Sequence, residues 1–408
     1  MVFETLRTRS ANAREALWAD GKGWILLTVS GGWLLTLGIR IVYPALLPDI
    51  MAAYGVSYTG GGFLLSALWI AYALMQFPGG LAADWVGERL VLVGSVGTVL
   101  AGVLAVVFAP TYGIFVAATV LVGFGAGLYG TSRVTVITDV FDDNRTTAVG
   151  FTQAAGNVGT SVLPVVAGLF AALFGWRLGF GYLVPLFVLV IVGTVVFIPR
   201  RTSAEPEVDA GLNRAFLRDL SGAVLNRNVV FITVLLLALM SYYQGITGFL
   251  PTYLIDIKGF SQPLASTVFG AFFATAIAMQ FVSGIVSDRY GQRLTIALFV
   301  SIALPAAMAL PVLESRAAII VATLAAAGVL GAFPPAHTYA VDLIPEALQG
   351  SGYGLVRTIY IGGGAGAPPV VGWLADGGSF DLAIVLLAAT TLVAIALCVA
   401  LPAIEPET

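Results

Sequence analysis

Three arginines lie inside long apolar runs of this sequence, where a permanent charge needs a reason. Arg40 stands in "LLTLGIRIVYPALLPD", Arg133 in "GLYGTSRVTVITDV" and Arg357 in "GYGLVRTIYIGGG". An arginine near the middle of a bilayer costs about 2.5–3.5 kcal/mol on insertion scales. All 22 acidic residues fall at the ends of the runs, in connections or at the termini. The arginines thus lack an obvious internal counter-ion, and guanidinium groups suit carboxylate, phosphate or sulfonate oxygens.

The apolar runs that carry these arginines are long enough to cross a membrane. Of the 408 residues, 59% are hydrophobic and 10% are charged, whereas soluble domains carry about 25% charged residues. Runs of about 20 apolar residues predict spanning helices. We therefore expect an all-α membrane protein with twelve transmembrane helices, at residues 24–48, 60–83, 90–109, 111–140, 146–174, 178–198, 228–253, 262–287, 294–313, 316–343, 348–375 and 381–402.

The longest connection, residues 199–227, divides the predicted helices into two sets of six. Outside the spans, 13 Lys and Arg residues lie on the side of the N-terminus and 3 on the other. Because basic residues stay in the cytoplasm, we expect both termini to be cytoplasmic, in the plasma membrane of a prokaryote. The expected parts are a cytoplasmic segment 1–23, a bundle 24–198, a cytoplasmic linker 199–227, a bundle 228–402 and a cytoplasmic tail 403–408.

The two sets of helices repeat each other with one offset. The stretch "MQFPGGLAADWVGERL" (75–90) aligns with "MQFVSGIVSDRYGQRL" (279–294), a shift of 204 residues from Met75 to Met279. The same shift places Pro164 on Pro368 and Gly168 on Gly372. Membrane carriers often contain such repeats, and repeats that run in parallel are related by an axis along the membrane normal.

The repeated stretch carries a motif, G-x-x-x-D-[RK]-x-G-x-[RK], after the second and eighth predicted helices. Over essentially its whole length, the chain resembles the major facilitator superfamily, which this motif typifies. Its first copy has Trp85 where the family usually has a basic residue. The resemblance implies two pseudo-symmetric six-helix bundles and transport by alternating access. The motif residues are Gly80, Asp84, Gly87 and Arg89 in the first copy, and Gly284, Asp288, Arg289, Gly291 and Arg293 in the second.

We expect the motif to act as a conformational latch on the cytoplasmic side. Asp84 and Asp288 would accept hydrogen bonds from a neighbouring helix N-terminus, where negative charge is favoured. Arg89, Arg289 and Arg293 would pair with carboxylates across the seam between the bundles. Such contacts exist in one arrangement of the halves and break in the other, so they bias a two-state equilibrium. The alternative is simple anchoring by positive charge on the cytoplasmic side.

The resemblance also implies that helices 1, 4, 7 and 10 line a central cavity, flanked by helices 2, 5, 8 and 11. All three arginines lie on such helices, and the repeat pairs each with a hydrogen-bonding residue of the other half. Tyr43 and Tyr129 lie one helical turn from an arginine, and Tyr242, Tyr243, Tyr339 and Tyr360 are further candidate donors. The expected substrate-binding residues are Arg40 with Gln244, Arg133 with His337, Arg357 with Gln153, and Tyr43 and Tyr129.

Arginines on helices 1 and 4 are similar to those of the anion:cation symporter branch, the relatives of sialin and the vesicular glutamate transporters. That branch usually has a carboxylate beside the first arginine, where this chain has Ile39. Its second carboxylate matches only roughly Asp139, six residues after Arg133. Asp139 and His337 are the candidates for coupling, since histidine can titrate near neutral pH.

The sequence thus predicts a secondary transporter for a small organic anion, with a carboxylate as the leading class, working as a symporter or an exchanger. H⁺ or Na⁺ is the candidate coupling ion, and lipid and the anion are the expected partners of a monomer. We expect no enzyme, cofactor, metal or nucleic-acid partner. The glycine pattern "GFGAG" at 123–127 lies inside a span and indicates close helix packing. The alternatives are a drug-type carrier of a neutral or cationic compound, or a receptor that kept the fold.

Overall fold

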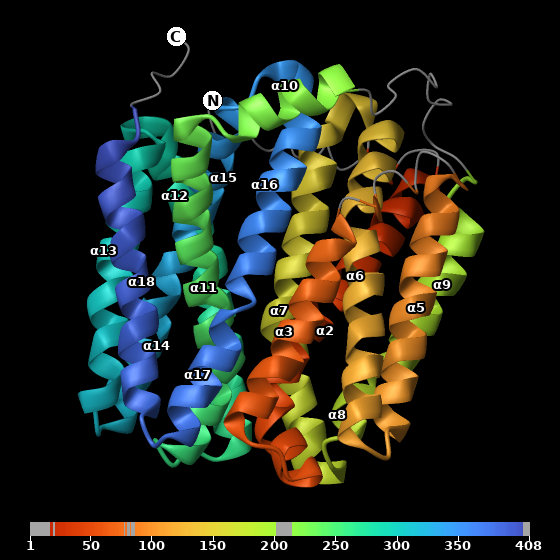
Figure 1. Cartoon of the computed structure of the whole chain (residues 1–408). Coiled ribbons are helices and arrows are strands. Elements are labelled where there is room, and N and C mark those ends of the chain that lie inside the picture. The colour runs from red at the N-terminus through yellow and green to blue at the C-terminus, as the bar shows by residue number, and fades with distance from the viewer. Residues whose placement is uncertain are drawn as a thin grey trace, which may run out of the picture.

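The computed structural model describes residues 17–18, 21–76, 78–79, 82, 86–200 and 214–402, which are mostly helical and include no strand (Figure 1). The first part of the chain forms α2 (Lys22–Tyr54), α3 (Tyr58–Leu74), α5 (Glu88–Phe108), α6 (Tyr112–Val140), α7 (Arg145–Phe174), α8 (Leu178–Gly181) and α9 (Leu183–Phe197). The second part forms α10 (Arg214–Val224), α11 (Arg227–Asp256), α12 (Gln262–Tyr290), α13 (Gln292–Ala309), α14 (Arg316–Ala326), α15 (Phe333–Asp342), α16 (Gln349–Gly364), α17 (Ala367–Asp376) and α18 (Phe380–Ala400).

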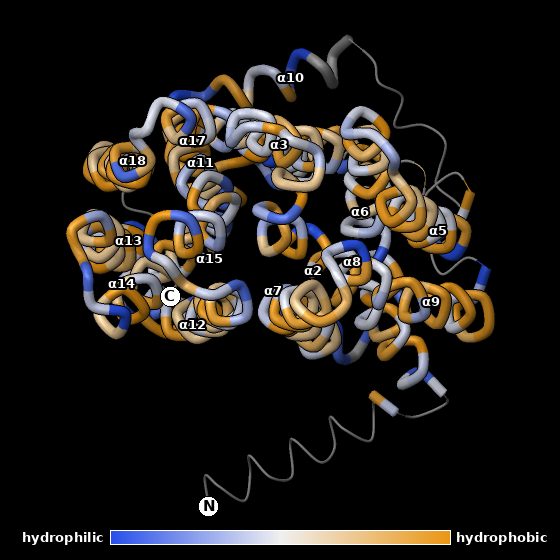
Figure 2. The backbone as a smooth tube through the Cα atoms, turned by 90° about the horizontal axis from the view of Figure 1, so that it is seen from below, coloured by the Kyte–Doolittle hydropathy of each residue, from blue (hydrophilic) through white to orange (hydrophobic). Residues whose placement is uncertain are grey.

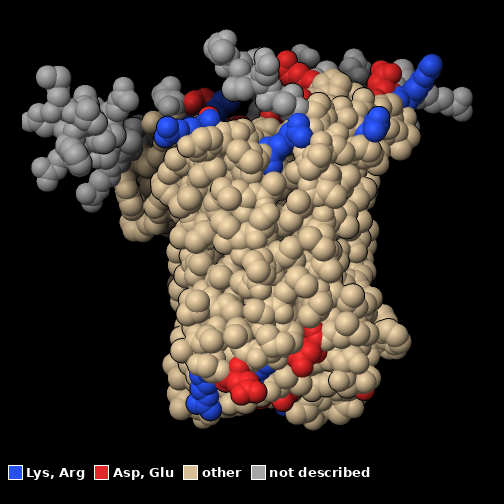
Figure 3. Space-filling view, turned by 90° about the vertical axis from the view of Figure 1, so that its left-hand side faces the viewer, with Lys and Arg blue, Asp and Glu red and all other residues tan. Residues whose placement is uncertain are grey.

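The helices have the length and composition of membrane spans. Among the described residues, 10 helical segments are long and apolar enough to cross a membrane, and α3 is a shorter apolar helix. The pair α16 and α17 covers the remaining predicted span, 348–375. On the face seen in Figure 3, charged side chains gather at two ends and leave an uncharged belt between them. The chain is therefore a multi-pass membrane protein, as the composition predicts.

The helices gather in two groups that lie side by side (Figure 2). Helices α2 to α9 form one group and α11 to α18 the other. Helix α10 lies across one end of the molecule (Figure 1), which we call the linker end. The opposite end, where α2 passes into α3 through residues 55–57, is called the far end.

Glycine backbone geometry explains part of the repeated motif. Gly87 precedes α5 with φ 87°, and its repeat partner Gly291 precedes α13 with φ 85°. Residues with a Cβ atom rarely adopt this positive φ, whereas glycine does so at little cost. At both positions the glycine lets the chain turn sharply from one helix into the next. The matching geometry confirms that the sequence repeat is also a structural repeat.

Small residues bring α6 and α3 into close contact. A Cβ atom on Gly123 would lie 2.5 Å from the carbonyl oxygen of Leu68, and one on Gly127 would lie 2.6 Å from that of Tyr72. Only glycine fits at such separations, so the two backbones touch. The prediction that "GFGAG" serves helix packing is confirmed. The contact also fixes the position of Tyr72, which is central to the site described next.

Candidate functional site

Arg40 lies in the interior of the molecule, on α2, with only 3% of its surface exposed. Its Cζ atom stands 3.9 Å from the centroid of the Tyr72 ring and 4.9 Å from that of Trp69, both on α3. Its buried Nε atom has no hydrogen-bond partner. Aromatic rings stabilise a guanidinium through its faces, so the N–H groups at its edge stay available to an acceptor.

Arg133, on α6, is held by its neighbours on α7. Its Nη1 donates to the hydroxyl of Thr152 at 2.8 Å, and its Nη2 donates to Oε1 of Gln153 at 3.0 Å. Its Cζ atom also lies 3.9 Å from the centroid of the Trp33 ring. The Nε atom is buried without a partner. Arg133 is therefore fixed in place by neutral groups while keeping its charge.

Arg357 enters the same region from the second group of helices, on α16. Its buried Nε atom has no partner either, and the hydroxyls of Tyr72, Tyr360 and Tyr353 lie within electrostatic range of its guanidinium. His337, on α15, lies beside them, with Nε2 3.2 Å from the hydroxyl of Tyr360. The single histidine of the chain is thus part of the surroundings of Arg357.

Tyr72 is the point on which the three arginines converge. It interacts electrostatically with Arg40, Arg357 and Arg133, and Arg133 and Arg357 also interact with each other. Three cations from α2, α6 and α16 therefore lie within electrostatic range of one phenol on α3, and Arg40 is in direct contact with its ring. We call Arg40, Arg133, Arg357 and Tyr72 the arginine site.

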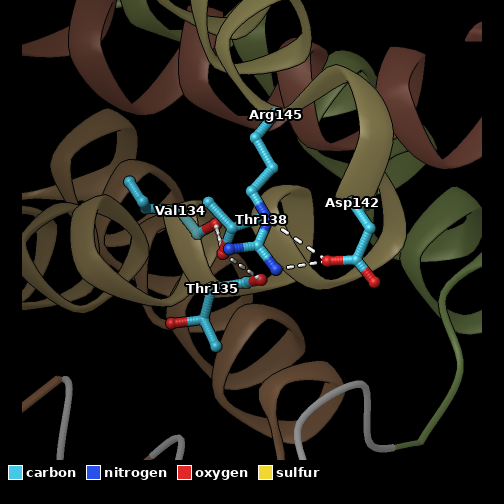
Figure 4. Close-up of polar contacts among 5 residues, drawn as sticks. All are labelled: Val134, Thr135, Thr138, Asp142 and Arg145. Carbon is cyan, nitrogen blue, oxygen red and sulfur yellow. Dashed lines mark hydrogen bonds and ion pairs between the residues drawn. The ribbon is translucent and has the colours of Figure 1, made fainter.

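No carboxylate forms a salt bridge with these arginines among the described residues. The ion pair found there joins Arg145 to Asp142, with Nε 3.2 Å from Oδ1, at the exposed connection between α6 and α7 (Figure 4). Figure 4 also shows the hydroxyl of Thr138, which donates to the carbonyl oxygens of Val134 and Thr135 on the last turns of α6. The ion pair lies at the linker end, away from the arginine site.

Three other predicted polar residues lie near the arginines in different ways. Gln153 contacts Arg133 directly and is exposed. Gln244 is fully buried on α11, where its Nε2 donates to the carbonyl oxygen of Ile361 at 3.0 Å and its Oε1 has no partner. Asp139 is half-buried in the last turn of α6. The structure thus brings Gln153 to a cation, whereas Gln244 joins two helices of its own group.

Tyr43 and Tyr129 lie inside the first group of helices. The ring of Tyr43 packs edge-on against Phe180 at 4.8 Å and Phe115 at 6.2 Å. The hydroxyl of Tyr129 donates to the carbonyl oxygen of Val29 on α2 at 2.9 Å. Both tyrosines are fully buried. Tyr43 is therefore a packing residue of this group, whereas Tyr129 also lies within electrostatic range of Arg133.

The motif arginines make contacts that differ from the predicted ones. Arg89 donates from Nη2 to the carbonyl oxygen of Val195, near the end of α9. Arg293 donates from Nε to that of Cys398 at 2.7 Å and from Nη2 to that of Val399 at 3.2 Å, at the end of α18. The prediction that Arg89 and Arg293 pair with carboxylates across the seam is wrong for this arrangement. The last carbonyls of a helix lack intrahelical donors and attract cations, so each arginine caps a helix of its own group.

The remaining motif residues complete this picture. Gly80 and Asp84 lie outside the described residues. A Cβ atom on Gly284 would meet open space, and Asp288 is exposed at the end of α12. Arg289 lies 5.5 Å from the ring centroid of the adjacent Tyr290. A cavity of about 1260 Å³ opens here at the linker end, lined by Asp288, Arg293 and Asp342 among others.

Replacing Arg293 with glutamine is expected to lower stability because two carbonyls of α18 lose their charged donor. A cation at a helix C-terminus contributes about 0.3–1 kcal/mol, and more when partly buried. We expect a drop of a few degrees in the thermal midpoint of the purified protein, measured by unfolding in detergent. Arg289→Gln, at the same end of the molecule, is the matched control and is expected to change the midpoint little. Equal midpoints for both variants would contradict the capping role.

A carboxylate does cap a helix across the two groups, but at the far end. Oδ1 of Asp376, at the end of α17, accepts a hydrogen bond from the backbone N–H of Tyr58 at 2.9 Å. Oδ2 accepts from the backbone N–H of Thr59 at 2.9 Å and from its hydroxyl at 2.6 Å. These are the first residues of α3, where the free N–H groups favour a negative charge. The sequence analysis missed this contact, although Asp376 stands at the end of a predicted span.

Further hydrogen bonds join the two groups towards the far end. The hydroxyl of Tyr58 donates to Oδ2 of Asp256 at 2.9 Å, and the amide of Gln262 donates to the carboxylate of Asp49. The hydroxyl of Ser66 donates to the carbonyl oxygen of Ala365, and the hydroxyl of Ser161 donates to that of Gly270 at 2.8 Å. Together these contacts close the far end of the arginine site.

Charged groups in the interior of a membrane-spanning helical bundle are typical of substrate or ion pathways. The sequence pattern of the Major Facilitator Superfamily matches residues 28–360 and 267–408. The chain belongs to this superfamily, and the resemblance drawn from the repeated motif is confirmed.

Relatives and solved structures agree with this assignment. The chain is 26% identical over 377 residues to the cis,cis-muconate transport protein of Acinetobacter baylyi, covering 90% of this chain and 89% of that protein. It is 24% identical over 367 residues to the fosmidomycin resistance protein of Escherichia coli, covering 88% of each. Its fold matches the crystal structure of a bacterial homolog of the human lysosomal transporter Spinster, inward-facing and unoccupied, with a TM-score of 0.75, 15% identity, and 93% and 96% of the two chains covered.

Proposed function

We propose that this chain is a secondary active transporter that moves a small organic anion by alternating access, with a carboxylate as the first class to test. One observation carries the proposal: three interior arginines, all within electrostatic range of Tyr72, each have a buried Nε that has no partner. Arginine stays charged at any relevant pH, and burying an unpaired charge is costly. A bound anion would offset that cost.

The proposed topology follows the distribution of basic residues. We propose twelve spans, formed by the ten long helices, by α3 and by the pair α16 and α17. Arg89, Arg145 and Arg293 lie at the linker end, whereas Arg177, Lys258 and Arg316 lie at the far end. The excess of basic residues therefore favours a cytoplasmic linker end, with both termini there. We propose a monomer in the prokaryotic plasma membrane, with bundles at 24–198 and 228–402.

Coupling would follow from the charge of the empty site. A carrier that reorients without its anion has to enclose several unneutralised cations, which desolvation penalises. Loaded reorientation is therefore favoured, as in anion exchange or in symport with H⁺ or Na⁺. Asp139 and His337 remain the candidate coupling residues. His337 is the better placed of the two, because it contacts Tyr360 beside Arg357.

The names of the two relatives support an anionic substrate. cis,cis-Muconate is a dicarboxylate, and fosmidomycin is a phosphonate, so both molecules carry negative charge at neutral pH. Both acid groups offer paired oxygens to a guanidinium. Identities of 26% and 24% leave room for a different substrate, so the class of headgroup is the proposal rather than either molecule.

A thermal-shift screen of the purified protein tests the proposal. The ligands are monocarboxylates, dicarboxylates, organophosphates, sulfonates and inorganic anions, at constant pH and ionic strength. A ligand that binds the folded state raises the midpoint, by an amount that grows with its concentration over the dissociation constant. Stabilisation by at least one organic anion is expected, and stabilisation by none would overturn the proposal. Liposome uptake with an imposed H⁺ or Na⁺ gradient, or with anion inside, then separates symport from exchange.

A second candidate is a drug-type exporter of a neutral or cationic compound, because several relatives are named for drug, multidrug or methyl viologen resistance. This candidate gives the arginines no role in recognition. It predicts that transport survives the loss of Arg40, which is the first experiment of the Discussion.

A further inference from the structure

A chain of aromatic rings runs from the first group of helices into the second. Trp69, on α3, lies 5.9 Å from Tyr72 and 5.8 Å from Tyr243 of α11, measured between ring centroids. Tyr243 in turn lies 6.1 Å from Phe333. The interplanar angles of these three contacts are 87°, 76° and 79°, so the rings meet edge to face. This is a preferred geometry for aromatic pairs.

The chain of rings continues to the surroundings of Arg357. Phe333 lies 5.7 Å from the ring of His337. His337 lies 6.1 Å from Tyr353 and is stacked 5.9 Å from Tyr360, and these two tyrosines interact with Arg357. Aromatic rings therefore connect Arg40, over Trp69 and Tyr72, with Arg357. We call Trp69, Tyr72, Tyr243, Phe333, Tyr353 and Tyr360 the aromatic wall.

The aromatic wall is not fully covered by protein. Tyr243, Phe333 and Tyr353 are half-buried, as is Arg357. They belong to α11, α15 and α16, three helices of the second group. Partly uncovered rings thus lie beside a guanidinium whose Nε lacks a partner.

The stacking of Arg40 determines what an anion can do there. Because the Tyr72 ring covers one face of the guanidinium at 3.9 Å, an oxyanion has to approach the edge, where the N–H groups lie. The rest of the bound molecule then extends along the wall. A flat π system can pair with rings at this distance by stacking or by its edge, whereas a saturated ring of the same size cannot.

We propose that the anion carried by this protein is planar next to its acid group, an aromatic or conjugated carboxylate or phosphonate rather than a saturated one. This inference rests on the proposed anion transport and names the substrate class of the same site. The aromatic wall acts as the specificity element, and the arginines bind the headgroup. Each aromatic pair adds enough to favour the planar ligand about 2- to 10-fold over a saturated ligand of equal charge.

Two matched pairs of ligands test the inference by isothermal titration of the purified chain. Benzoate is compared with cyclohexanecarboxylate, and phenylphosphonate with cyclohexylphosphonate. The members of each pair share the headgroup and the size and differ in planarity. We expect the aromatic member to bind about 2- to 10-fold more tightly in at least one pair. Binding of both members with equal affinity in each pair that binds would overturn the inference and leave anion binding intact. If none of the four ligands binds and no anion of the wider screen stabilises the protein, the proposed function is overturned as well. If another anion of the screen stabilises the protein and none of the four binds, only the inference of a planar substrate is overturned.

Variants of the wall localise the effect. Tyr243→Leu and Phe333→Leu each remove an aromatic ring and keep the arginines. In each variant, the ratio of the dissociation constants of the saturated and aromatic ligands is expected to fall towards one, while the saturated ligand still binds. Phe281→Leu is the matched control, because Phe281 is 73% exposed on α12, and it is expected to keep the full preference. An unchanged preference in both wall variants would contradict the role of the wall. Should a wall variant aggregate, the two ligand pairs on the natural chain still decide.

Discussion

Arg40→Gln is expected to abolish anion binding and transport. The substitution keeps a shorter, neutral polar side chain and removes the guanidinium that Trp69 and Tyr72 hold in place. Loss of one partner of a buried, hydrogen-bonded charge pair costs about 2–5 kcal/mol, which is at least about 30-fold in affinity. The measurement is uptake of the best ligand from the screen into liposomes, with its dissociation constant determined on the same preparation.

Two further variants interpret this result. Arg40→Lys keeps the charge without the planar fork and is expected to bind weakly, because lysine cannot donate to two oxygens in parallel. Arg177→Gln is the matched control: Arg177 also stacks on a tryptophan, 4.5 Å from the Trp176 ring, but at the far end. It is expected to transport normally. Full transport by Arg40→Gln would favour the drug-type candidate instead.

Asp376→Ala is expected to shift the transporter towards an arrangement that is open at the far end. The substitution removes the acceptor of three hydrogen bonds that hold the start of α3 to the end of α17. Hydrogen bonds to a charged group contribute about 1.5–3 kcal/mol when buried. Asp376 is exposed, so we expect the smaller effect of about tenfold in the ratio of closed to open molecules.

Distances between spin labels across the far end measure this shift. Suitable label sites are Gly113→Cys and Glu314→Cys, two exposed positions in opposite groups, in a Cys398→Ser background. The control is Asp381→Ala, because Asp381 accepts a hydrogen bond from Tyr253 at 2.6 Å within its own group. A longer-distance population is expected to grow in Asp376→Ala alone. Identical distance distributions in the two variants would show that the cap of α3 does not hold the far end closed.

The arginines could be predicted as a cluster because their position breaks a strong rule of composition. A cation in an apolar run is conspicuous, and the family resemblance places all three on helices that line or flank the cavity. Tyr72 and Trp69, in contrast, carry no such signal. In the sequence "SALWIAYAL" they look like residues of any apolar helix. Only the approach of α6 to α3 at Gly127 reveals that Tyr72 points among the three cations.

The structure separates Tyr43 from Arg40, although the two residues lie one helical turn apart, for a physical reason. Residues one turn apart share a face on an isolated helix. Helix α2, however, has neighbours on most of its sides, so side chains one turn apart meet different helices. Arg40 meets α3, whereas Tyr43 meets Phe115 of α6 and Phe180 of α8. Sequence spacing therefore locates a buried residue along its helix better than around it.

The contacts of the motif could not be predicted from one sequence because they depend on the arrangement of the halves. Asp376 makes at the far end the kind of contact expected of Asp84 and Asp288, in which a carboxylate accepts hydrogen bonds from a helix N-terminus. The sequence indicates such residues but not which end of the molecule is closed. Capping of α9 and α18 by Arg89 and Arg293 stays within each group, so it is a property of the fold itself.

The caps made by Arg89 and Arg293 show one feature that the two sequence repeats share, whereas the interior arginines show one in which they differ. The hydrogen bond from Arg89 to the carbonyl of Val195 has its equivalent in the bond from Arg293 to the carbonyl of Val399. The helical scaffold therefore has the same contact in both halves. The interior positions differ between the copies: the shift of 204 residues aligns Arg40, Arg133 and Arg357 with the neutral residues Gln244, His337 and Gln153. Two cations thus come from one half and one from the other. If the proposed anion binds here, the symmetric helical frame with its unequal charge would favour one orientation of the bound molecule over the reverse.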